Sequence, residues 1–532
     1  MTAVDRTPSD DADVCVVGSG PAGALPAYRL ADEGYDVVVL EAGRRFPRSE
    51  RQQRMERSIR PAWNDDEVWS MGGARDRYVS DGERSYPLNA ARVKGVGGTT
   101  LHWQGMVMRL HERDFELRSR TGLGRDWPIS YDDVRPYYAE AERELGVAGG
   151  DDNPHAPPRD EPHPMPAFSP SHSDSLLREA CEEAGLTVHT TTNARNSEPY
   201  DDRSECVAYG TCQPVCPSGA KYSADVHVRK AESEGARVID RARVTELEHD
   251  RRGDHVEAAV YVTPDETRHR QEADVFVVAC GGVETPRLLL NSDSREHPDG
   301  LANSSGAVGR YFTDHVFAGA GGVVDFETRQ NHVGFVTSES HEYYDGDELT
   351  PLGVKIELFN YAGPSPVVSA LDADTWGDEL LERLRDEYGG HVGLGALVEQ
   401  LPRWDNRVSL DPDETDDLGL PVPRVTWDVD EKTERAITEV NDVQHDVLDG
   451  VDARDRWTSG PEETGPAFHH MCTTRMGADP DDSVVDERGL AHDLDNLYVT
   501  GSSVFVTGGA MNPTLTIAAL ALRTADAVAA EL

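Results

Sequence analysis

Lysine is scarce in this chain of 532 residues: five lysines accompany 47 arginines, and 98 acidic residues bring the formal net charge to −46. Such a chain repels the phosphates of nucleic acids and anionic membrane surfaces, so we expect no nucleic-acid partner. Concentrated salt screens this self-repulsion, and the acidity together with the bias towards arginine predicts a protein adapted to high salt. An ordinary acidic cytosolic protein is the alternative.

Long apolar runs are also missing. No stretch approaches the roughly 18 apolar residues of a membrane-spanning helix, so we expect no direct membrane insertion. Residues 1–11 are polar and acidic, with neither the apolar core of a secretion signal nor a twin-arginine signal. We therefore expect a cytoplasmic location by default, and export together with a partner subunit stays open.

Cysteine is rare and unevenly distributed. The seven cysteines are an odd number, which argues against a disulfide framework, and Cys206, Cys212 and Cys216 crowd together ahead of Pro217. Their spacing differs from the paired C-x2-C of a zinc ribbon, and three close thiolates followed by proline suit an iron–sulfur cluster. Reduced structural thiols or an incidental disulfide are the alternatives.

A glycine-rich motif near the N-terminus predicts a dinucleotide-binding unit. The β-branched run 14–17 leads into Gly18, Gly20 and Gly23, a helical pattern follows, and a second apolar strand ends in Glu41. The glycines allow close approach of the backbone to a pyrophosphate, which the helix N-terminus attracts. Glu41 lies 18 residues beyond Gly23, where an acid accepts hydrogen bonds from ribose hydroxyls. Strand, loop, helix and acid in this order are a strong signal.

The sequence pattern of the rest of the chain predicts a loop, several strands and two helices. Seven prolines in 154–170 predict an extended surface loop over residues 148–173. Residues 238–247 and 256–262 alternate as antiparallel strands do, whereas 274–282 and 496–500 are typical of buried parallel strands. Further strands are predicted at 316–324, 332–337, 352–360, 391–399, 407–410 and 424–427. Helices at 376–388 and 436–447 carry apolar stripes that we expect to pack on a sheet.

Seven blocks follow one another along the chain. They are residues 18–23 (GSGPAG) with Glu41, 96–103 (VGGTTLHW), 279–290 (ACGGVETPRLLL), 308–315 (VGRYFTDH), 469–477 (HHMCTTRMG), 496–505 (NLYVTGSSVF) and 511–523 (MNPTLTIAALALR). Together they resemble the glucose–methanol–choline (GMC) oxidoreductase family, from residue 13 to the C-terminus. The resemblance implies an α/β fold with a Rossmann-like FAD-binding domain and a second substrate domain, whose antiparallel sheet is backed by helices.

The same resemblance divides the chain and assigns the cofactor. It implies an FAD-binding domain over 1–315 that includes the loop 148–173 and the cysteine segment 206–217, a substrate domain over 316–465, and a return to the FAD-binding domain over 466–532. The residues it implies for FAD binding are Gly18, Gly20, Gly23, Glu41, Gly97, Gly98, Thr99, His102, Val244, Gly281, Gly501, Ser502, Asn512, Pro513 and Thr514.

Position by position, the catalytic pair of the family falls on His469 and Asn512. The resemblance implies that His469 takes the proton of a substrate hydroxyl while hydride leaves the same carbon for the flavin, and a histidine suits this because its pKa lies near working pH. Asn512 is expected to hydrogen-bond the same oxygen and to cap the last helix, with Pro513 in the first turn. The neighbouring His470 is the weaker candidate, because adjacent side chains point in different directions.

Two further segments indicate a branch of the family. The block around His102 resembles one that, in some members, bonds a histidine to the flavin 8-methyl group, and non-covalent packing is the alternative. Cys206, Cys212 and Cys216 are spaced similarly to cysteines in the large subunits of FAD-dependent sugar dehydrogenases. That resemblance implies a [3Fe–4S] cluster, a small partner subunit and an electron-acceptor protein.

The expected activity is therefore oxidation of a CH–OH group of a small-molecule alcohol, with a sugar or sugar acid as the first choice and electrons relayed to an acceptor other than oxygen. Three other hypotheses stay open: an oxygen-using alcohol or sterol oxidase without a cluster, an FAD-binding electron-transfer subunit that oxidises no alcohol, and a lyase in which FAD is structural. Intact His469 and Asn512 argue against the second, and a cysteine cluster has no purpose in the third.

Overall fold

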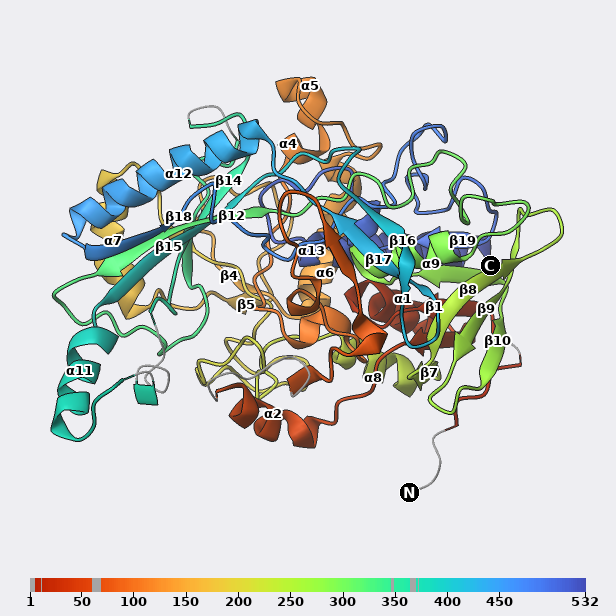
Figure 1. Ribbon diagram of the computed structural model, residues 1–532, viewed down its shortest axis with the longest axis horizontal. Helices are drawn as coiled ribbons and strands as arrows, with labels where there is room; N and C mark the ends of the chain where they lie inside the picture. The colour runs from red at the N-terminus through yellow and green to blue at the C-terminus, as the bar shows by residue number, and fades with distance from the viewer. Residues whose placement is uncertain (1–4, 11, 60–67, 346–348, 364–369, 372) are drawn as a thin grey trace.

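The computed structural model describes residues 5–10, 12–59, 68–345, 349–363, 370–371 and 373–532 (Figure 1). It contains two large sheets, and the first of them is parallel. Its strand order is β19-β11-β1-β2-β7, and every neighbouring pair is parallel. The strands are β1 (Val14–Val17), β2 (Val37–Glu41), β7 (Arg237–Asp240), β11 (Val275–Val278) and β19 (Leu497–Val499).

The two faces of this sheet have different partners. Successive side chains of a strand point to opposite faces. Val14 and Val16 therefore pack with the helices, whereas Cys15 and Val17 join a cluster that also contains residues of β8 and β9. The helices are α1 (Pro21–Asp32), α8 (Asp225–Ser233) and α13 (Thr514–Glu531), and the antiparallel strands are β8 (Arg243–His249), β9 (Val256–Val262) and β10 (Arg268–Glu272). This layering is the dinucleotide-binding arrangement that the glycine motif predicts.

The prediction of one antiparallel strand over residues 238–247 is confirmed for 243–247 and wrong for 238–240. The segment forms two strands in two sheets: β7 lies parallel to β2, and β8 pairs antiparallel with β9 after a turn in which Arg241 has φ +54°. Alternation of apolar and polar residues reports that one face of a strand is exposed, and it carries no information on the direction of its neighbour. An edge strand of a parallel sheet therefore has the same sequence pattern.

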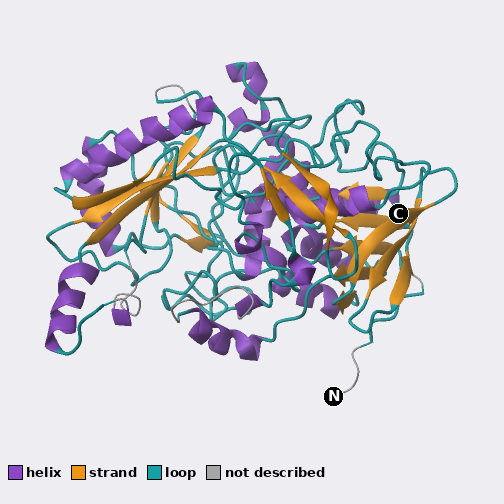
Figure 2. Ribbon diagram, viewed as in Figure 1, coloured by secondary structure: helices purple, strands orange, loops and turns teal. Residues whose placement is uncertain are grey.

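A six-stranded antiparallel sheet lies on the other side of the molecule (Figure 2). Its order is β18-β12-β15-β14-β13-β6. The strands are β6 (His189–Thr190), β12 (Val316–Val323), β13 (Ser338–Ser340), β14 (Val354–Leu358), β15 (His391–Val398) and β18 (Arg454–Ser459). Helix α12 (Glu431–Gly450) packs on β12 and β15, and its stripe of Ile437, Val440 and Val447 is buried, as the sequence predicts.

Two other predictions for this region are wrong. Residues 332–337, all described, form no strand, and the strand lies at β13 instead. Helix α11 (Asp378–Tyr388) projects from the body of the molecule, with Trp376 88% exposed and Leu381 50% exposed, so these apolar residues do not pack on a sheet (Figure 1). Amphipathic spacing identifies a helix but does not identify what covers it.

The remaining elements connect these layers, and residues 148–173 run mainly as a loop. The remaining described strands are β3 (Val79–Asp81), β4 (Ala148–Gly149), β5 (Met165–Pro166), β16 (Arg407–Thr415) and β17 (Pro421–Thr426), of which β16, β17 and β3 form a small sheet. The remaining described helices are α2 (Arg51–Ser58), α4 (Glu112–Phe115), α5 (Leu117–Thr121), α6 (Tyr131–Leu145), α7 (His172–Glu183) and α9 (Gly281–Asn291). Within the described ranges, no helix has the combined length and apolarity needed to cross a membrane.

Gly23 sets how closely α1 packs on the glycine turn. A Cβ at Gly23 would lie 2.0 Å from the carbonyl oxygen of Gly18, and this oxygen belongs to backbone that cannot swing away. We expect Gly23→Ala to destabilise the protein by about 3 kcal/mol, the upper end of ordinary overpacking, and to lower its melting temperature. Gly465→Ala is the control, because an added Cβ there meets no atom within 4 Å. Equal melting temperatures for the two variants would contradict this packing.

Candidate active site

A cavity of about 720 Å³ lies between the two large sheets. Val17, Leu40 and Glu41 line it at the carboxyl ends of β1 and β2, which is where open α/β sheets bind their ligands. Phe317 and Leu397 of the six-stranded sheet close its other side. The volume is that of a site for a cofactor-sized ligand together with a small substrate.

Two glycine segments bring bare backbone to the cavity. Gly18 has φ +100°, and a Cβ on it would lie 2.7 Å from the carbonyl oxygen of Ala279. A Cβ on Gly98 would lie 2.8 Å from Cα of Gly20, so the turn before α1 and the turn at 97–98 touch without side chains between them. The N-terminus of α1 begins at Pro21 in the cavity wall, where its dipole favours a pyrophosphate.

Glu41 fixes the shape of this turn. Its carboxylate is 5% exposed and accepts hydrogen bonds from the backbone N–H of Ser19 at 3.0 Å, the Ser19 hydroxyl at 2.6 Å and the backbone N–H of Gly43 at 2.8 Å. Burial raises the pKa of Glu41, while these hydrogen bonds to the charged form oppose the rise. The buried acid at the cavity edge and the glycine cradle together fit a dinucleotide.

Most residues that the resemblance implies for FAD binding lie in the cavity wall. They are Gly18, Gly20, Glu41, Gly98, Thr99, His102, Val244, Gly281, Gly501, Ser502, Asn512, Pro513 and Thr514. Gly23 and Gly97 lie outside the wall: the first packs under the Gly18 turn and the second beside Asp225.

His469 and Asn512 lie side by side in the cavity wall, and a second histidine orients them. Nε2 of His469 lies 3.5 Å from Nδ2 of Asn512, and Nδ1 of His469 lies 2.8 Å from Nδ1 of His315. Nε2 of His315 lies 3.2 Å from the carbonyl oxygen of Gly508, which can only accept a hydrogen bond. His315 therefore carries its proton on Nε2, and His469 donates from Nδ1. This leaves the lone pair of His469 on Nε2.

Lys355 of β14 holds the Asn512 amide. Its ammonium donates to Oδ1 of Asn512 at 2.6 Å and pairs with Glu357 at 2.7 Å, and its side chain is fully buried. Because the amide oxygen is occupied, the amide NH₂ of Asn512 is left for His469 and the cavity. The prediction that Asn512 caps the last helix is therefore wrong: Pro513 takes the N-cap position of α13 without a side-chain hydrogen bond.

Burial keeps both His469 and His315 neutral. Burial lowers the pKa of His469 well below its usual range, and the neighbouring His315 and the Lys355 ammonium lower it further. Burial likewise lowers the pKa of His315 to about 4. The neutral form, which a general base needs, is therefore the form present at neutral pH.

His315 and Lys355 are not among the site residues predicted from the sequence. His315 ends the block 308–315, so the block itself was a signal for it. In β14, Lys355 and Glu357 alternate with apolar residues, and all five residues of the strand are buried. An opposite-charge pair two residues apart inside a buried strand is unusual enough to indicate a polar site.

His102 and His470 occupy other parts of the cavity wall. His102 is buried, and burial lowers its pKa to about 3, so its imidazole is neutral. The ring of His470 stacks on Phe312 with centroids 6.2 Å apart, and its carbonyl group packs against Gly282. The ring of His470 therefore packs against Phe312, whereas the ring of His469 faces Asn512.

The cysteine segment lies directly behind the cavity. Lys221 is buried and donates to the backbone carbonyl groups of Cys212 (2.8 Å) and Trp103, which ties the cysteine loop to the segment next to His102. Gln213, between two of the cysteines, reaches the cavity wall. All three thiols are free.

The three cysteines are not arranged for a single metal ion. Among the residues that the structure describes, His189, Glu339 and His341 are the one set of three such side chains with ligand atoms all within 4.8 Å of one another. In an iron–sulfur cluster each thiolate binds a different iron, so the sulfurs stand farther apart than around one ion. Three free thiols on one loop are a donor set that fits such a cluster.

The fold and this cavity define an α/β oxidoreductase of the dinucleotide-binding class. Two models of the family described as GMC oxidoreductase match residues 35–317 and 402–521, respectively. The chain belongs to the GMC oxidoreductase family, and FAD is the cofactor that membership implies.

Known relatives cover almost the whole chain. It is similar to the fructose dehydrogenase large subunit of Gluconobacter japonicus, with 34% identity over 98% of both chains. It is also similar to the 2-methyl-1,2-propanediol dehydrogenase of Mycolicibacterium austroafricanum, with 31% identity over 98% of this chain and 95% of that one. A solved structure of Aspergillus oryzae formate oxidase superposes with a TM-score of 0.71 over 99% of both chains at 16% identity, which shows the shared fold.

We expect Glu41→Gln to weaken FAD binding about tenfold or more, because a hydrogen bond to a charged group contributes roughly 1.5–3 kcal/mol. The substitution places an NH₂ group among N–H donors and leaves one acceptor oxygen where the carboxylate has two. The measurement is the FAD dissociation constant by flavin fluorescence after removal and readdition of the cofactor. Glu33→Gln, at the exposed end of α1, is the control. Equal affinities in the two variants would remove Glu41 from the cofactor site.

Proposed function

We propose that this chain is an FAD-dependent dehydrogenase that oxidises a CH–OH group of a small-molecule alcohol, with sugars and sugar acids as the first substrates to test. The observation that carries the proposal is the neutral His469, whose unprotonated Nε2 lies 3.5 Å from the Asn512 amide nitrogen in the wall of the cavity. Support for the substrate class comes from the relatives, which are named for fructose and for a diol.

The chemistry that the chain supplies is proton transfer and orientation. The substrate hydroxyl would donate to Nε2 of His469, and the amide NH₂ of Asn512 would donate to the same oxygen. His469 then holds the substrate proton on Nε2 while its Nδ1–H stays bonded to His315. FAD, when bound, supplies the acceptor for the hydride that leaves the carbon. Removal of one proton and one hydride converts the alcohol to a carbonyl.

The proposed division of the chain into an FAD-binding part and a substrate part follows the two large sheets. We assign residues 1–315 and 466–532 to FAD binding and 316–465 to the substrate. The thirteen wall residues named above are the proposed FAD contacts, and Gly23 and Gly97 support the glycine turns from behind the wall. His102 is assigned to the flavin, as a packed or covalently linked ring. Phe317, Leu397 and Tyr361 then shape the substrate end of the cavity.

Cys206, Cys212 and Cys216 are proposed to hold a [3Fe–4S] cluster, whose chemistry is one-electron transfer. The support is the position of the cysteine loop, which contacts the His102 segment through Lys221 and reaches the cavity through Gln213. Electrons from substrate oxidation would leave the flavin on this side for an acceptor other than oxygen. A small partner subunit and an acceptor protein fit this scheme, because one relative is itself a large subunit.

The charge excess supports a further proposal about conditions. With 98 acidic against 52 basic side chains, the protein is proposed to be adapted to concentrated salt, where self-repulsion is screened. Activity measurements on it therefore belong in molar salt. A cytoplasmic location remains a proposal as well.

Removal of the proposed base should abolish turnover without loss of the flavin. We expect His469→Gln to lower kcat by about 10²–10⁴-fold, the usual contribution of a general base. The measurement is anaerobic bleaching of the bound flavin by candidate alcohols in a stopped-flow instrument. His470→Gln is the matched control, and we expect a much smaller loss because its ring packs on Phe312. Equal losses in both variants would contradict the assignment of the base.

The Lys355 ammonium should set the acid limb of the pH profile. It lowers the pKa of His469, and the base must be neutral, so activity in the native protein persists towards acid pH. In Lys355→Met the pKa of His469 rises, and we expect the acid limb of kcat/KM to move to higher pH, with a lower kcat because Asn512 loses its hydrogen bond. Lys355→Arg keeps the cation and should keep the limb near its native position. An unmoved limb in Lys355→Met would refute this electrostatic role.

The cluster is tested by composition. Protein purified without oxygen in molar salt should contain roughly three irons and acid-labile sulfide per FAD and give a three-iron EPR signal when oxidised. Cys212→Ser should lose the iron, and Cys181→Ser, a buried thiol outside the loop, should retain it. No iron in the native protein, with rapid peroxide formation from an alcohol, would identify an oxidase instead.

A further inference from the structure

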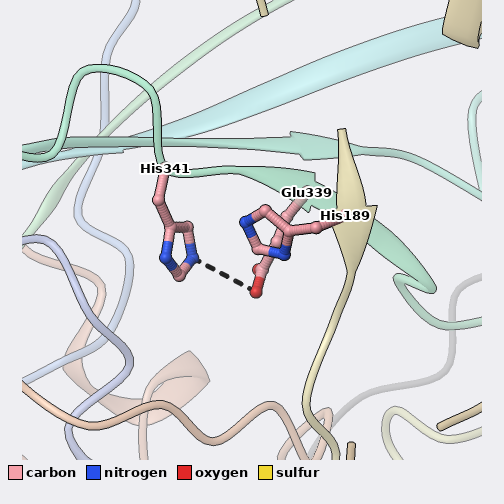
Figure 3. Close-up of side chains that lie close together, drawn as sticks. All are labelled: His189, Glu339 and His341. Atoms are coloured by element: carbon pink, nitrogen blue, oxygen red, sulfur yellow. Dashed lines mark ion pairs between the residues drawn. The ribbon is translucent and has the colours of Figure 1, made fainter. Parts of the chain in front are cut away.

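Three buried side chains with metal-binding chemistry gather on the six-stranded sheet, outside the cavity wall (Figure 3). His189 on β6 stands directly opposite Glu339 on β13 in an antiparallel pair. His341 follows Glu339 by two residues and therefore projects from the same face. Their ligand atoms all lie within 4.8 Å of one another.

None of these three side chains has its polar atoms satisfied towards the cluster. His189, Glu339 and His341 are 1%, 1% and 3% exposed. Within the described part of the chain, Nε2 of both histidines and Oε2 of Glu339 make no hydrogen bond. Oε2 of Glu339 faces the Lys355 ammonium at 3.6 Å, whereas Oε1 faces His341. Buried polar atoms are almost always hydrogen-bonded, so the two histidine Nε2 atoms beside this carboxylate indicate a missing partner.

The distance between His341 and Glu339 suits a tetrahedral ion. Nε2 of His341 lies 3.2 Å from Oε1 of Glu339. Two ligands at about 2.1 Å from a tetrahedral zinc ion stand roughly 3.4 Å apart. Figure 3 shows the His341 ring and the Glu339 carboxylate facing each other, with the His189 ring beside them.

The histidines are in the neutral form that a metal needs. Nδ1 of His189 lies 3.1 Å from the carbonyl oxygen of Thr190, so its proton sits on Nδ1 and Nε2 presents a lone pair. Nδ1 of His341 lies 3.0 Å from the Asn153 amide nitrogen. The oxygen of that amide accepts from the backbone N–H of His155 at 2.9 Å, so its NH₂ faces the ring and His341 carries its proton on Nε2. A metal at Nε2 must displace this proton, and its transfer to Nδ1 requires the Asn153 amide to give up the His155 hydrogen bond.

The charges around the three residues are compatible with a bound cation. The Lys355 ammonium lies 3.6 Å from Glu339, but it is already paired with Glu357 at 2.7 Å. Asp345 lies near His341 and adds negative charge, with a side chain 66% exposed to solvent. If Glu339 bound an ion, Lys355 would keep its contacts with Glu357 and Asn512. These contacts orient the amide of Asn512.

We propose that His189, Glu339 and His341 bind one divalent transition-metal ion, with Zn²⁺ as the fitting choice. The ion takes Nε2 of each histidine and the carboxylate of Glu339, and a water completes the tetrahedron. Zinc has no redox chemistry, so the site stands apart from the electron path. It ties β6 to β13, two segments far apart in the sequence, and so stabilises the edge of the six-stranded sheet.

The test uses the full-length holoprotein without a histidine tag, freed of loose metal by EDTA and kept in molar salt. Titration with Co²⁺, a spectroscopic substitute for Zn²⁺, should give intense tetrahedral d–d bands at wavelengths beyond flavin absorption, which saturate at one equivalent. Zn²⁺ should displace the Co²⁺ and raise the melting temperature, because an ion that binds the folded state stabilises it. No saturable tetrahedral spectrum in the native protein would overturn the proposal without any variant.

Variants test whether the metal binds at His189, Glu339 and His341 or at acidic groups on the surface. His189→Gln and Glu339→Gln should lose the tetrahedral spectrum and the zinc-dependent rise in melting temperature, with folding checked by retention of FAD. His163→Gln is the matched control, a histidine of the neighbouring loop that bonds to Arg159 and belongs to no cluster. Retention of the full spectrum in His189→Gln and Glu339→Gln would assign the metal elsewhere and refute the site.

Discussion

The hydrogen-bonded chain from the Gly508 carbonyl through His315, His469 and Asn512 to Lys355 is the constraint on which the proposed chemistry depends. Its two ends are fixed by groups whose roles cannot reverse: a carbonyl oxygen only accepts, and an ammonium only donates. Each group between them therefore has one allowed orientation. The consequence is a neutral imidazole with its lone pair on Nε2 next to an amide NH₂, both in the cavity wall.

Such a chain is costly to bury, and the surrounding sheet supports it. Lys355 is fully buried, and Glu357 on the same face of β14 neutralises its charge. Removing one partner of a buried ion pair costs about 3–5 kcal/mol, because the other charge is then left buried and unpaired. Charge at Lys355 also acts on His469 and lowers its pKa. The six-stranded sheet therefore lowers the pKa of the proposed base, which the C-terminal segment supplies, so the proposed site needs both large sheets.

The sequence predicted the parts of the molecule that are specified locally. The turn at Gly18, the buried strand ending in Glu41 and the apolar stripe of α12 all follow from neighbouring residues, and the blocks around His469 and Asn512 identified the family. The role of His315 could not be predicted in the same way, because its partner lies 154 positions away. The direction of β7, the exposure of α11 and the side-chain partner of Asn512 likewise depend on contacts between distant segments.

The protonation of His469 is the central claim, and nitrogen NMR of histidine labelled with ¹⁵N measures it directly. His315→Gln and His469→Gln assign the two rings among the 19 histidines. In the flavin-loaded protein at neutral pH, we predict that His469 is neutral with its proton on Nδ1 and that His315 is neutral with its proton on Nε2. A His469 ring with its proton on Nε2, or a doubly protonated ring, would contradict the account, because no lone pair would then face the substrate.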